Sequence, residues 1–476
     1  MAMLSVNPTT EAVLQTFEEF SDAQVDAALQ GAHDAQLSWR TTSFGERAAR
    51  LQAVARALRE QKSRLATLAT TEMGKPIVEA EAEIEKCAWN CDFYAEHAVR
   101  FLADEHIETN ASESYVAFEP LGVVLAIMPW NFPFWQVVRF AAPALMAGNG
   151  AVLKHASNVP GCAVAIEELF RTAGLPEGLF CTVLVPGSKV DRLIADPRIQ
   201  AVTLTGSSEV GERVASAAGK QLKKQVLELG GSDPFIVLAD ADLDAAAATA
   251  VRARNQNNGQ SCIAAKRFIV EEPVADQFTA RFAAAVKALR VGDPLERDTN
   301  VGPLARGDLR DALAEQVEKS VAQGARTVVG GHAVTGQGFF YAPTVLDGVK
   351  DDMPAFREET FGPVAAVIRA RDADHAVRLA NDTEYGLGAA LWTRDIQGAK
   401  DLARRIEAGS VFINGMVASD PRLPFGGIKR SGYGRELGVY GIREFVNAKT
   451  VWVKDRPEHL GEERRQGDRR RGNRRT

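Results

Sequence analysis

The first hundred residues place apolar side chains at the spacing of amphipathic helices. The segment SDAQVDAALQGAHDAQLSWR begins at Ser21, a residue type that caps helix N-termini. The pattern continues through FGERAARLQAVARALREQKSRLATLATTEMGKP and through VEAEAEIEKCAWNCDFYAEHA, so residues 21–105 are predicted to be helical. Cys87 and Cys91 share one face of the last helix. We interpret them as packing residues, because no second pair of ligands follows at metal-binding spacing.

From residue 121 onward, short apolar runs alternate with helical patterns. The runs LGVVLAIMP, GAVLKH and IQAVTLTGS are predicted strands, and WQVVRFAAPALMAGN and PGCAVAIEELFRTAG are predicted helices. A second series follows with KQVLELGG, PFIVLADAD and AKRFIVEE, and a third with GPVAAVIRA, GAALWTRD and SVFING. Strands that alternate with helices imply right-handed βαβ units. The pattern therefore predicts a two-domain α/β enzyme with mostly parallel sheets.

Composition narrows the class of protein. The chain has 476 residues, 46% hydrophobic and 25% charged, which is ordinary for a soluble globular protein. A net charge of -6 provides no general basic field for nucleic acid. Five cysteines are few and odd in number, which indicates a reducing compartment rather than a disulfide framework. No signal peptide is recognised, and the most apolar window, 121–138, contains two prolines, an asparagine and a glutamine. We expect a cytoplasmic protein with no membrane span.

The end of the chain differs from the rest. The segment GEERRQGDRRRGNRRT contains seven arginines, three acidic residues and no apolar residue, a local net charge of +4. Residues 457–476 are therefore predicted to be a disordered Arg-rich tail. Two interpretations are open: a solvated tail, which we favour, and a contact with RNA or another polyanion.

Two residues stand in positions that suggest covalent chemistry. Cys262, in NNGQSCIAAKR, sits among small and polar residues rather than in an apolar run, as a reactive thiol would. Glu228, in VLELGGSDP, follows an apolar strand, and strand ends are where α/β sheets bind ligands. Burial there would raise the pKa of Glu228 and suit it to act as a general base. The alternatives are a buried small hydrophobe for Cys262 and a surface strand end for Glu228.

Two further motifs offer polar groups to a reaction. In MPWNFPFWQ, prolines flank Asn131, so its amide would be held rigidly as an oxyanion donor or, alternatively, would stabilise a turn. In VTLTGSSEVGERV, a strand, a turn at Gly206 and a helix present a helix N-terminus to a pyrophosphate. This second motif is not the G-x-G-x-x-G dinucleotide fingerprint.

Six motifs together resemble those of the aldehyde dehydrogenase superfamily, and the resemblance covers residues 5–455. The motifs are PWNFP, LTGSSEVG, LELGGSDP, GQSCIAAKR, EETFGPV and FGGIKRSGYGRE. Within this superfamily, the chain looks like the bacterial and cyanobacterial succinate-semialdehyde dehydrogenases. The resemblance implies a Rossmann-like cofactor-binding domain, an α/β catalytic domain and a small β oligomerisation arm. Their expected residues are 1–109 with 128–226, then 227–420, and finally 110–127 with 437–456. The arm implies a homodimer or homotetramer.

The resemblance also implies residue roles. Cys262 would attack the aldehyde carbon, Asn131 and the Cys262 N–H would hold the oxyanion, and Glu228 would activate the water that hydrolyses the thioester. The implied cofactor-binding residues are Trp130, Lys154, Ser157, Gly206, Ser207, Glu359 and Phe361.

The residues of the segment VLKHASN are expected to determine which cofactor the protein prefers. NAD-preferring relatives typically have a glutamate three residues after the lysine, where this chain has Ser157. A missing carboxylate removes repulsion against a 2′-phosphate, and Lys154 supplies positive charge. We therefore expect NADP, with NAD as the alternative. His155 replaces the usual proline, so the sequence does not determine the local backbone conformation.

For the substrate, Arg139 lies two helical turns beyond Asn131. An arginine that faces the substrate tunnel would pair with a carboxylate, as in succinate-semialdehyde dehydrogenases. Trp135 would form a tunnel wall, and Ser419 matches a loop position that contacts the carboxylate. The alternative for Arg139 is a surface salt bridge. The alternatives for the substrate are glutarate semialdehyde and a broad range of aliphatic aldehydes.

Overall fold

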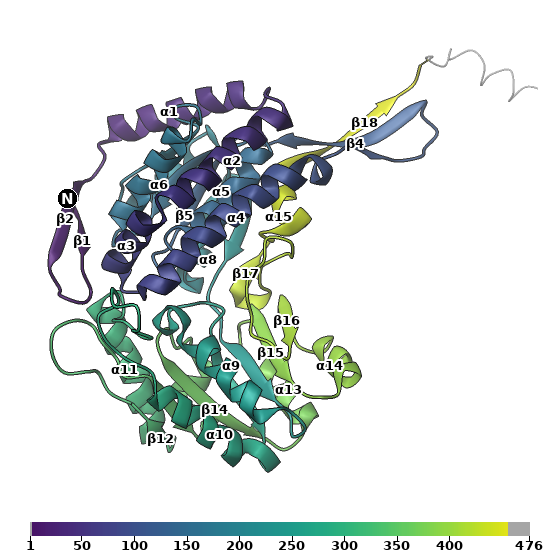
Figure 1. Cartoon of the computed structure of the whole chain (residues 1–476). Helices are drawn as coiled ribbons and strands as arrows, with labels where there is room; N and C mark the ends of the chain where they lie inside the picture. The colour runs from purple at the N-terminus through teal and green to yellow at the C-terminus, as the bar shows by residue number, and fades with distance from the viewer. Residues whose placement is uncertain (1, 456–476) are drawn as a thin grey trace, which may run out of the picture.

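The computed structural model describes residues 2–455, so the Arg-rich tail predicted over 457–476 lies outside the described residues (Figure 1). The predicted helical region is confirmed. Ser21 and Ser43 each cap a helix, and each forms a capping box with the side chain three residues later. The helices are α1 (Asp22–Trp39), α2 (Phe44–Glu60), α3 (Lys62–Met73) and α4 (Ile77–Phe101).

The first lobe is built on a six-stranded sheet. Its order is β17-β9-β8-β5-β6-β7, and every pair is parallel except β17 with β9. Alternate residues of β5 enter two different cores: Val124 and Ala126 pack beneath α4 and α5, whereas Leu125 packs with residues of α1 and α8. The strands are β5 (Val123–Met128), β6 (Gly150–His155), β7 (Phe180–Thr182), β8 (Ile199–Thr205), β9 (Lys224–Glu228) and β17 (Gly432–Tyr433), with helices α5 (Trp135–Met146), α6 (Pro160–Thr172), α7 (Val190–Ala195) and α8 (Ser208–Lys220).

The second lobe is built on a seven-stranded sheet with the order β12-β13-β14-β11-β10-β15-β16. Only β12 pairs antiparallel, so the predicted mostly parallel α/β architecture is confirmed. Its strands are β10 (Asp233–Val237), β11 (Ala265–Glu271), β12 (Arg326–Val329), β13 (Thr344–Asp347), β14 (Val364–Ala370), β15 (Gly388–Trp392) and β16 (Ser410–Ile413). Its helices are α9 (Leu243–Asn255), α10 (Glu272–Lys287), α11 (Gly307–Ala322), α12 (Pro354–Arg357), α13 (Ala373–Asn381) and α14 (Ile396–Ala403).

A three-stranded antiparallel sheet projects from the first lobe as an arm (Figure 1). It contains β3 (Glu105–His106), β4 (Glu113–Pro120) and β18 (Val446–Val453), and α15 (Gly438–Arg443) precedes its last strand. The predicted arm range 110–127 is therefore too long, because β5 pairs inside the six-stranded sheet. The predicted boundary at 226/227 also cuts β9, which continues to Glu228. An N-terminal hairpin of β1 (Ala2–Val6) and β2 (Val13–Glu18), absent from the predicted elements, precedes α1.

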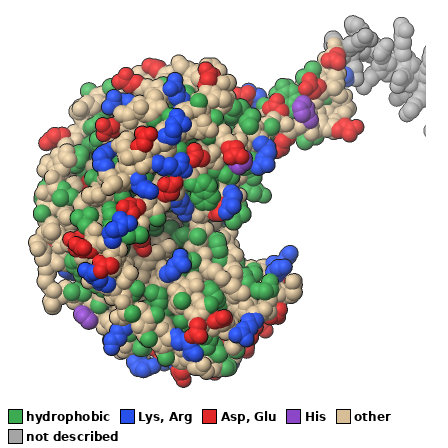
Figure 2. All heavy atoms as spheres, viewed as in Figure 1, with side chains coloured by type: hydrophobic (Ala, Val, Ile, Leu, Met, Phe, Trp, Pro, Cys, Tyr) green, Lys and Arg blue, Asp and Glu red, His purple; other side chains and the backbone are tan. Residues whose placement is uncertain are grey.

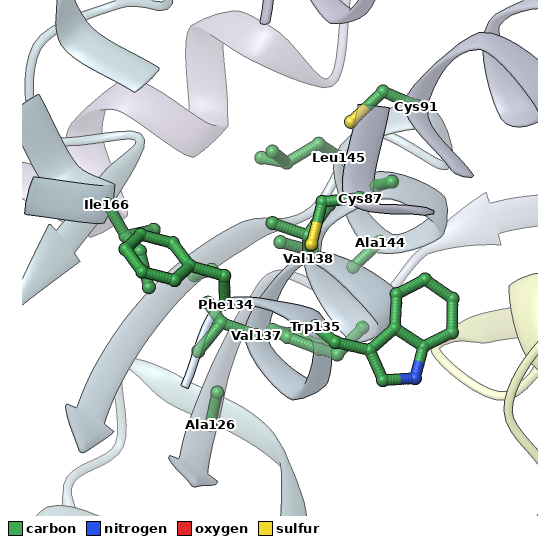
Figure 3. Packing of buried hydrophobic residues seen from close by; sticks show 14 of the residues in the cluster. Cys87, Cys91, Ala126, Phe134, Trp135, Val137, Val138, Ala144, Leu145 and Ile166 are labelled. Atoms are coloured by element: carbon green, nitrogen blue, oxygen red, sulfur yellow. The ribbon is translucent and has the colours of Figure 1, made fainter. Parts of the chain in front are cut away.

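The two lobes enclose a hollow, which opens to the right in the space-filling view (Figure 2). In the first lobe, Cys87 and Cys91 are fully buried beside Val138 and Leu145 of α5, as the packing interpretation predicts (Figure 3). Within residues 2–455, no helix is long and apolar enough to cross a membrane.

A buried ion pair joins the helical layer to the start of α5. Lys75 and Glu83 form a salt bridge with side chains 0% and 2% exposed. The other oxygen of Glu83 accepts hydrogen bonds from the backbone N–H groups of Phe134 and Trp135, at 2.9 and 2.8 Å. Helix α5 has no capping side chain of its own, and Glu83 of α4 accepts hydrogen bonds from its first N–H groups instead. The negative charge of Glu83 also interacts favourably with the positive end of the α5 dipole.

This arrangement predicts a large loss of stability for Lys75→Met. The substitution leaves the Glu83 charge buried without its cation, which should lower the free energy of unfolding by about 3–5 kcal/mol. Urea denaturation monitored by circular dichroism measures the change. Lys62→Met is the matched control, because Lys62 pairs with Glu85 at the surface and should contribute only about 0–1 kcal/mol. Equal shifts in the two variants would contradict the role of the buried pair.

Candidate active site

Cys262 lies half-buried on the wall of a cavity of about 450 Å³. Side chains of α4, α5, α9 and the loop before β17 surround it. Three of the sequence-predicted substrate residues, Trp135, Arg139 and Ser419, line the same cavity. The remaining polar or charged lining residues are Glu79, Glu83, Lys86, Gln136, Arg252, Asn255, Gln256, Asn257, Ser261 and Asn300.

The loop before Cys262 depends on left-handed backbone. Asn257, Asn258 and Gly259 follow one another with φ values of 55°, 58° and 74°. Asparagine tolerates this region better than most residues, and glycine adopts it freely. A Cβ at Gly259 would lie 2.3 Å from the backbone of Gly362, so the position also has no room for a side chain. These residues turn the chain sharply between α9 and β11 and bring Cys262 to the cavity.

Asn131 lies beside this loop and is held from both sides. Its Nδ2 donates to the carbonyl of Gln260 at 3.0 Å, and its Oδ1 accepts from Gln136 Nε2 at 2.9 Å. Its own carbonyl accepts from Asn257 Nδ2 at 2.8 Å. The amide orientation is therefore fixed, with the NH₂ group toward the cysteine loop. Asn131 is 4% exposed and is not one of the residues lining the cavity.

The Cys262 thiol is electrostatically costly to ionise. Burial raises its pKa to about 12, and the nearby charges of Lys266 and Arg139 oppose that rise. Lys266 is fully buried and donates to the carbonyls of Ser261 and Cys262 at 2.9 and 2.8 Å. It thus fixes the backbone of the loop and supplies positive charge close to the sulfur. Lys266 is not among the residues predicted from the sequence, although it lies only four residues beyond the cysteine.

Glu359 pairs with the same lysine inside the second lobe and reaches the segment that joins β9 to β10. Its carboxylate lies 3.6 Å from Lys266 Nζ and accepts a hydrogen bond from the Gly231 N–H at 3.1 Å. Burial raises the pKa of Glu359, and Lys266 opposes that shift. Phe361, two residues later, packs edge-on against Trp130 with ring centroids 5.7 Å apart. The implied ribose and nicotinamide residues therefore lie close to the cysteine loop.

Glu228 ends β9 and is 2% exposed, so the alternative of a surface strand end is wrong. Neither of its carboxylate oxygens has a hydrogen-bond partner among the described residues. Burial, reinforced by the charge of Glu436, raises the pKa of Glu228, as predicted for a general base. The carboxylate lies against Gly426, where an added Cβ would be 2.6 Å from Oε1, and it is not part of the cavity lining.

Arg139 lines the cavity, and the alternative of a surface salt bridge is wrong because the residue is 3% exposed. Its Nε forms a buried ion pair with Glu436, and its Nη2 lies 3.3 Å from Thr205 Oγ1. The guanidinium also lies 4.7 Å from the centre of the Phe425 ring. The charge of Arg139 is thus already matched by a carboxylate, which the sequence analysis did not foresee because Glu436 is distant in the chain.

Lys86 of α4 lines the cavity, although it is not among the residues predicted from the sequence. Its Nζ donates to Ser419 Oγ at 2.7 Å and lies 4.4 Å from the centre of the Trp135 ring. Burial, with the charge of Arg139, lowers the pKa of Lys86 to about 8. Glu79, Glu83 and Lys86 recur at helical spacing on α4 and all line the cavity. That spacing was visible in the sequence, but a polar helical face is usually solvated.

A second cavity, of about 550 Å³, gathers Trp130, Lys154 and Ser157. Lys154 is buried, which lowers its pKa, and Ser157 is exposed at the rim. Arg306 adds a second basic side chain, which is paired with Asp308 outside the lining, and the lining itself contains no aspartate or glutamate. Cations and hydroxyl donors without a carboxylate suit a phosphate group. The residues present therefore fit a phosphorylated nucleotide.

The remaining cofactor candidates lie near the ends of the same sheet. Ser207 caps α8 by accepting from the Val210 N–H, and Gly206 precedes it, but neither lines the second cavity. His155 keeps the end of β6 in regular pairing, although it replaces the expected proline. Burial lowers the pKa of His155 to about 4, so the ring is neutral, and Nε2 bonds the Pro133 carbonyl at 2.9 Å.

Comparison with known proteins adds to this geometry. Residues 2–451 match the family described as "Aldehyde dehydrogenase family". A probable NADP(+) succinate-semialdehyde dehydrogenase of Synechocystis is 55% identical over 453 residues, covering 95% of this chain and 100% of that protein. The NADP(+) succinate-semialdehyde dehydrogenase of Mycobacterium avium is 52% identical over 457 residues, covering 95% and 97%.

Solved structures agree with the sequence match. The crystal structure of succinic semialdehyde dehydrogenase from Streptococcus pyogenes, in complex with NADP+, has a TM-score of 0.93 and 38% identity. It covers 95% of this chain and 100% of that chain. The fold, the family match over nearly the whole chain and the identity to these relatives lead to one conclusion: this chain belongs to the aldehyde dehydrogenase family.

Proposed function

We propose that the protein oxidises succinic semialdehyde to succinate and uses NADP. The observation that carries the proposal is the cavity in which Cys262 meets two basic side chains, Arg139 and Lys86. An aldehyde that also bears a carboxylate matches this combination of thiol and positive charge. Relatives more than 50% identical over 95% of the chain carry the same activity in their names.

The proposed reaction begins with attack of the Cys262 sulfur on the aldehyde carbon. The new C–S bond leaves a tetrahedral oxyanion, which the Asn131 side-chain N–H and the Cys262 backbone N–H stabilise. Gln136 holds the Asn131 amide in the orientation that presents its N–H donors. Lys266 and Arg139 favour the thiolate that makes the attack, against the cost of burial.

The oxidation to a thioester requires a hydride acceptor, which bound NADP would supply. We propose that Lys154 and Ser157 bind the adenosine side of the cofactor, and Gly206 with Ser207 its pyrophosphate. Trp130, Glu359 and Phe361 are assigned to the nicotinamide side. Support comes from the second cavity, which joins Trp130, Lys154 and Ser157 and has no carboxylate that would repel a 2′-phosphate. NAD is the alternative.

Glu228 is proposed to remove a proton from the water that hydrolyses the thioester and releases succinate. Its raised pKa favours proton uptake, and its oxygens have no partner among the described residues that would hold the carboxylate in place. We propose that the side chain reorients from Gly426 toward the cavity, a movement that breaks no hydrogen bond among the described residues.

We further propose that residues 1–109 with 128–226 bind the cofactor and residues 227–420 form the catalytic domain, with the strand-end adjustments given above. The arm supports a homodimer or homotetramer, because β18 lies at one edge of its sheet and leaves backbone groups for a partner strand. A cytoplasmic location is part of the same proposal.

A substrate panel tests the activity. We expect kcat/KM for succinic semialdehyde with NADP to exceed the values for glutarate semialdehyde and for uncharged butanal. The reason is that Lys86 and Arg139 line the same cavity as Cys262, so a short aldehyde that bears a carboxylate can contact the thiol and a cation together. Absorbance of the reduced cofactor measures each rate. Preference for glutarate semialdehyde, or equal values for all three, would favour the alternative substrates.

Glu228→Gln tests the hydrolytic step. The variant should release about one equivalent of NADPH per Cys262 in a rapid burst and then turn over about 10²–10⁴-fold more slowly. In the unmodified protein, turnover should decline as the pH is lowered through the raised pKa of Glu228, because the base becomes protonated. Stopped-flow absorbance follows both phases, and Cys262→Ala, which should give no burst, is the control. A Glu228→Gln variant with normal steady-state turnover would contradict the role.

Ser157→Glu tests the cofactor site. A carboxylate there repels the 2′-phosphate and accepts hydrogen bonds from ribose hydroxyls, so the ratio of kcat/KM with NADP to that with NAD should fall about 10-fold or more. Ser157→Ala, which removes only the hydroxyl, should change the ratio much less. If Ser157→Glu leaves the ratio unchanged, discrimination lies elsewhere in the second cavity.

A further inference from the structure

We propose that Lys86 binds the substrate carboxylate beside Ser419, the loop residue that the family resemblance already implies, and that Lys86 sets the preference for acidic aldehydes. The inference rests on the proposed function and assigns its specificity to α4, where the sequence singled out only Cys87 and Cys91.

Lys86 differs from the other basic residues of the cavity. Arg139 is already paired with Glu436, and Arg252 of α9 is exposed to solvent. Lys86 forms no ion pair with any carboxylate of residues 2–455. Of the cavity's three cations, it is thus the one that is both partly buried and without a counter-charge.

The acids nearest to Lys86 are engaged elsewhere. Glu83, one turn earlier on α4, is bound by Lys75 and by two backbone N–H groups of α5. Asp420 is paired with Arg422 at the surface. From outside α4, the charge of Arg139 lowers the pKa of Lys86, and the more distant effect of Asp420 opposes it without forming an ion pair. An incoming carboxylate would therefore supply the missing counter-charge, which is a strong source of selectivity where water is partly excluded.

The neighbours of Lys86 are arranged for a carboxylate. Ser419 Oγ accepts from Lys86 Nζ, so its hydroxyl hydrogen remains available to donate to a second acceptor. An ammonium N–H and a hydroxyl O–H side by side can bind the two oxygens of one carboxylate. The Trp135 ring lies against the ammonium at 4.4 Å and fixes its position, and its apolar face can line the methylenes of a short chain.

The ratio of kcat/KM for succinic semialdehyde to kcat/KM for butanal measures this role, because chemistry at Cys262 is common to both aldehydes. Lys86→Met, which keeps most of the side-chain volume, should lower the ratio about 10- to 100-fold. Lys86→Arg keeps the charge and should retain most of the ratio. Lys62→Met, the same change at an exposed lysine of α3, is the matched control and should leave the ratio within about twofold of the original.

The pH profile gives a second readout that does not depend on the Met variant folding. The pKa of Lys86 is lowered to about 8, so the ammonium is present below that pH and is lost above it. The ratio in the unmodified protein should therefore fall as the pH rises from 7 to 9.5. In Lys86→Arg it should stay nearly constant, because a guanidinium keeps its proton over this range.

The outcomes separate this inference from the proposed function. A high ratio at pH 7 that survives Lys86→Met, or that is independent of pH in the unmodified protein, would overturn the role of Lys86 and leave the proposed function intact. A ratio near one in the unmodified protein would contradict both. A ratio that falls selectively in Lys86→Met and with rising pH would support both.

Discussion

Helix α5 begins inside the core without a capping side chain of its own, and the carboxylate of Glu83 accepts hydrogen bonds from its first N–H groups. The neighbourhood of the cysteine depends on this contact, because the loop that carries Asn131 leads into α5, and Trp135 and Arg139 lie on it. A buried carboxylate is costly unless it is both paired and hydrogen-bonded. Lys75 and the helix N-terminus together meet that requirement.

The same face of α4 also reaches the cysteine loop. Glu79 Oε2 accepts from the Asn257 N–H at 2.5 Å, and burial raises the pKa of Glu79 to about 7. One helix thus binds the Asn131 side of the cavity through Glu83 and the Cys262 side through Glu79. One turn further on, it presents Lys86. The helical layer therefore positions the reactive groups as well as covering the sheet.

Each lobe contributes one group of matched charges to the site. Arg139 of the first lobe is paired with Glu436, and Glu436 in turn raises the pKa of Glu228. In the second lobe, Lys266 joins the carbonyls of the cysteine loop to Glu359. These groups are buried, where the dielectric constant is low, so a change in the charge of one group alters the pKa values of its neighbours. The reactivity of Cys262 is therefore a property of the whole arrangement.

The sequence by itself determined the α/β architecture, the helical first hundred residues and the motifs around Cys262, Glu228 and Asn131. Periodicity and turn residues are local signals, and a thiol among small polar residues is visible without a fold. Only the tertiary structure decided that Arg139 is neutralised by Glu436, that β5 belongs to the main sheet rather than the arm, and that α4 turns Glu79, Glu83 and Lys86 toward the cavity. The reason is physical. Polar residues at helical spacing give the same sequence pattern whether they face water or a cavity. Ion-pair partners depend on packing between segments that are far apart in the chain.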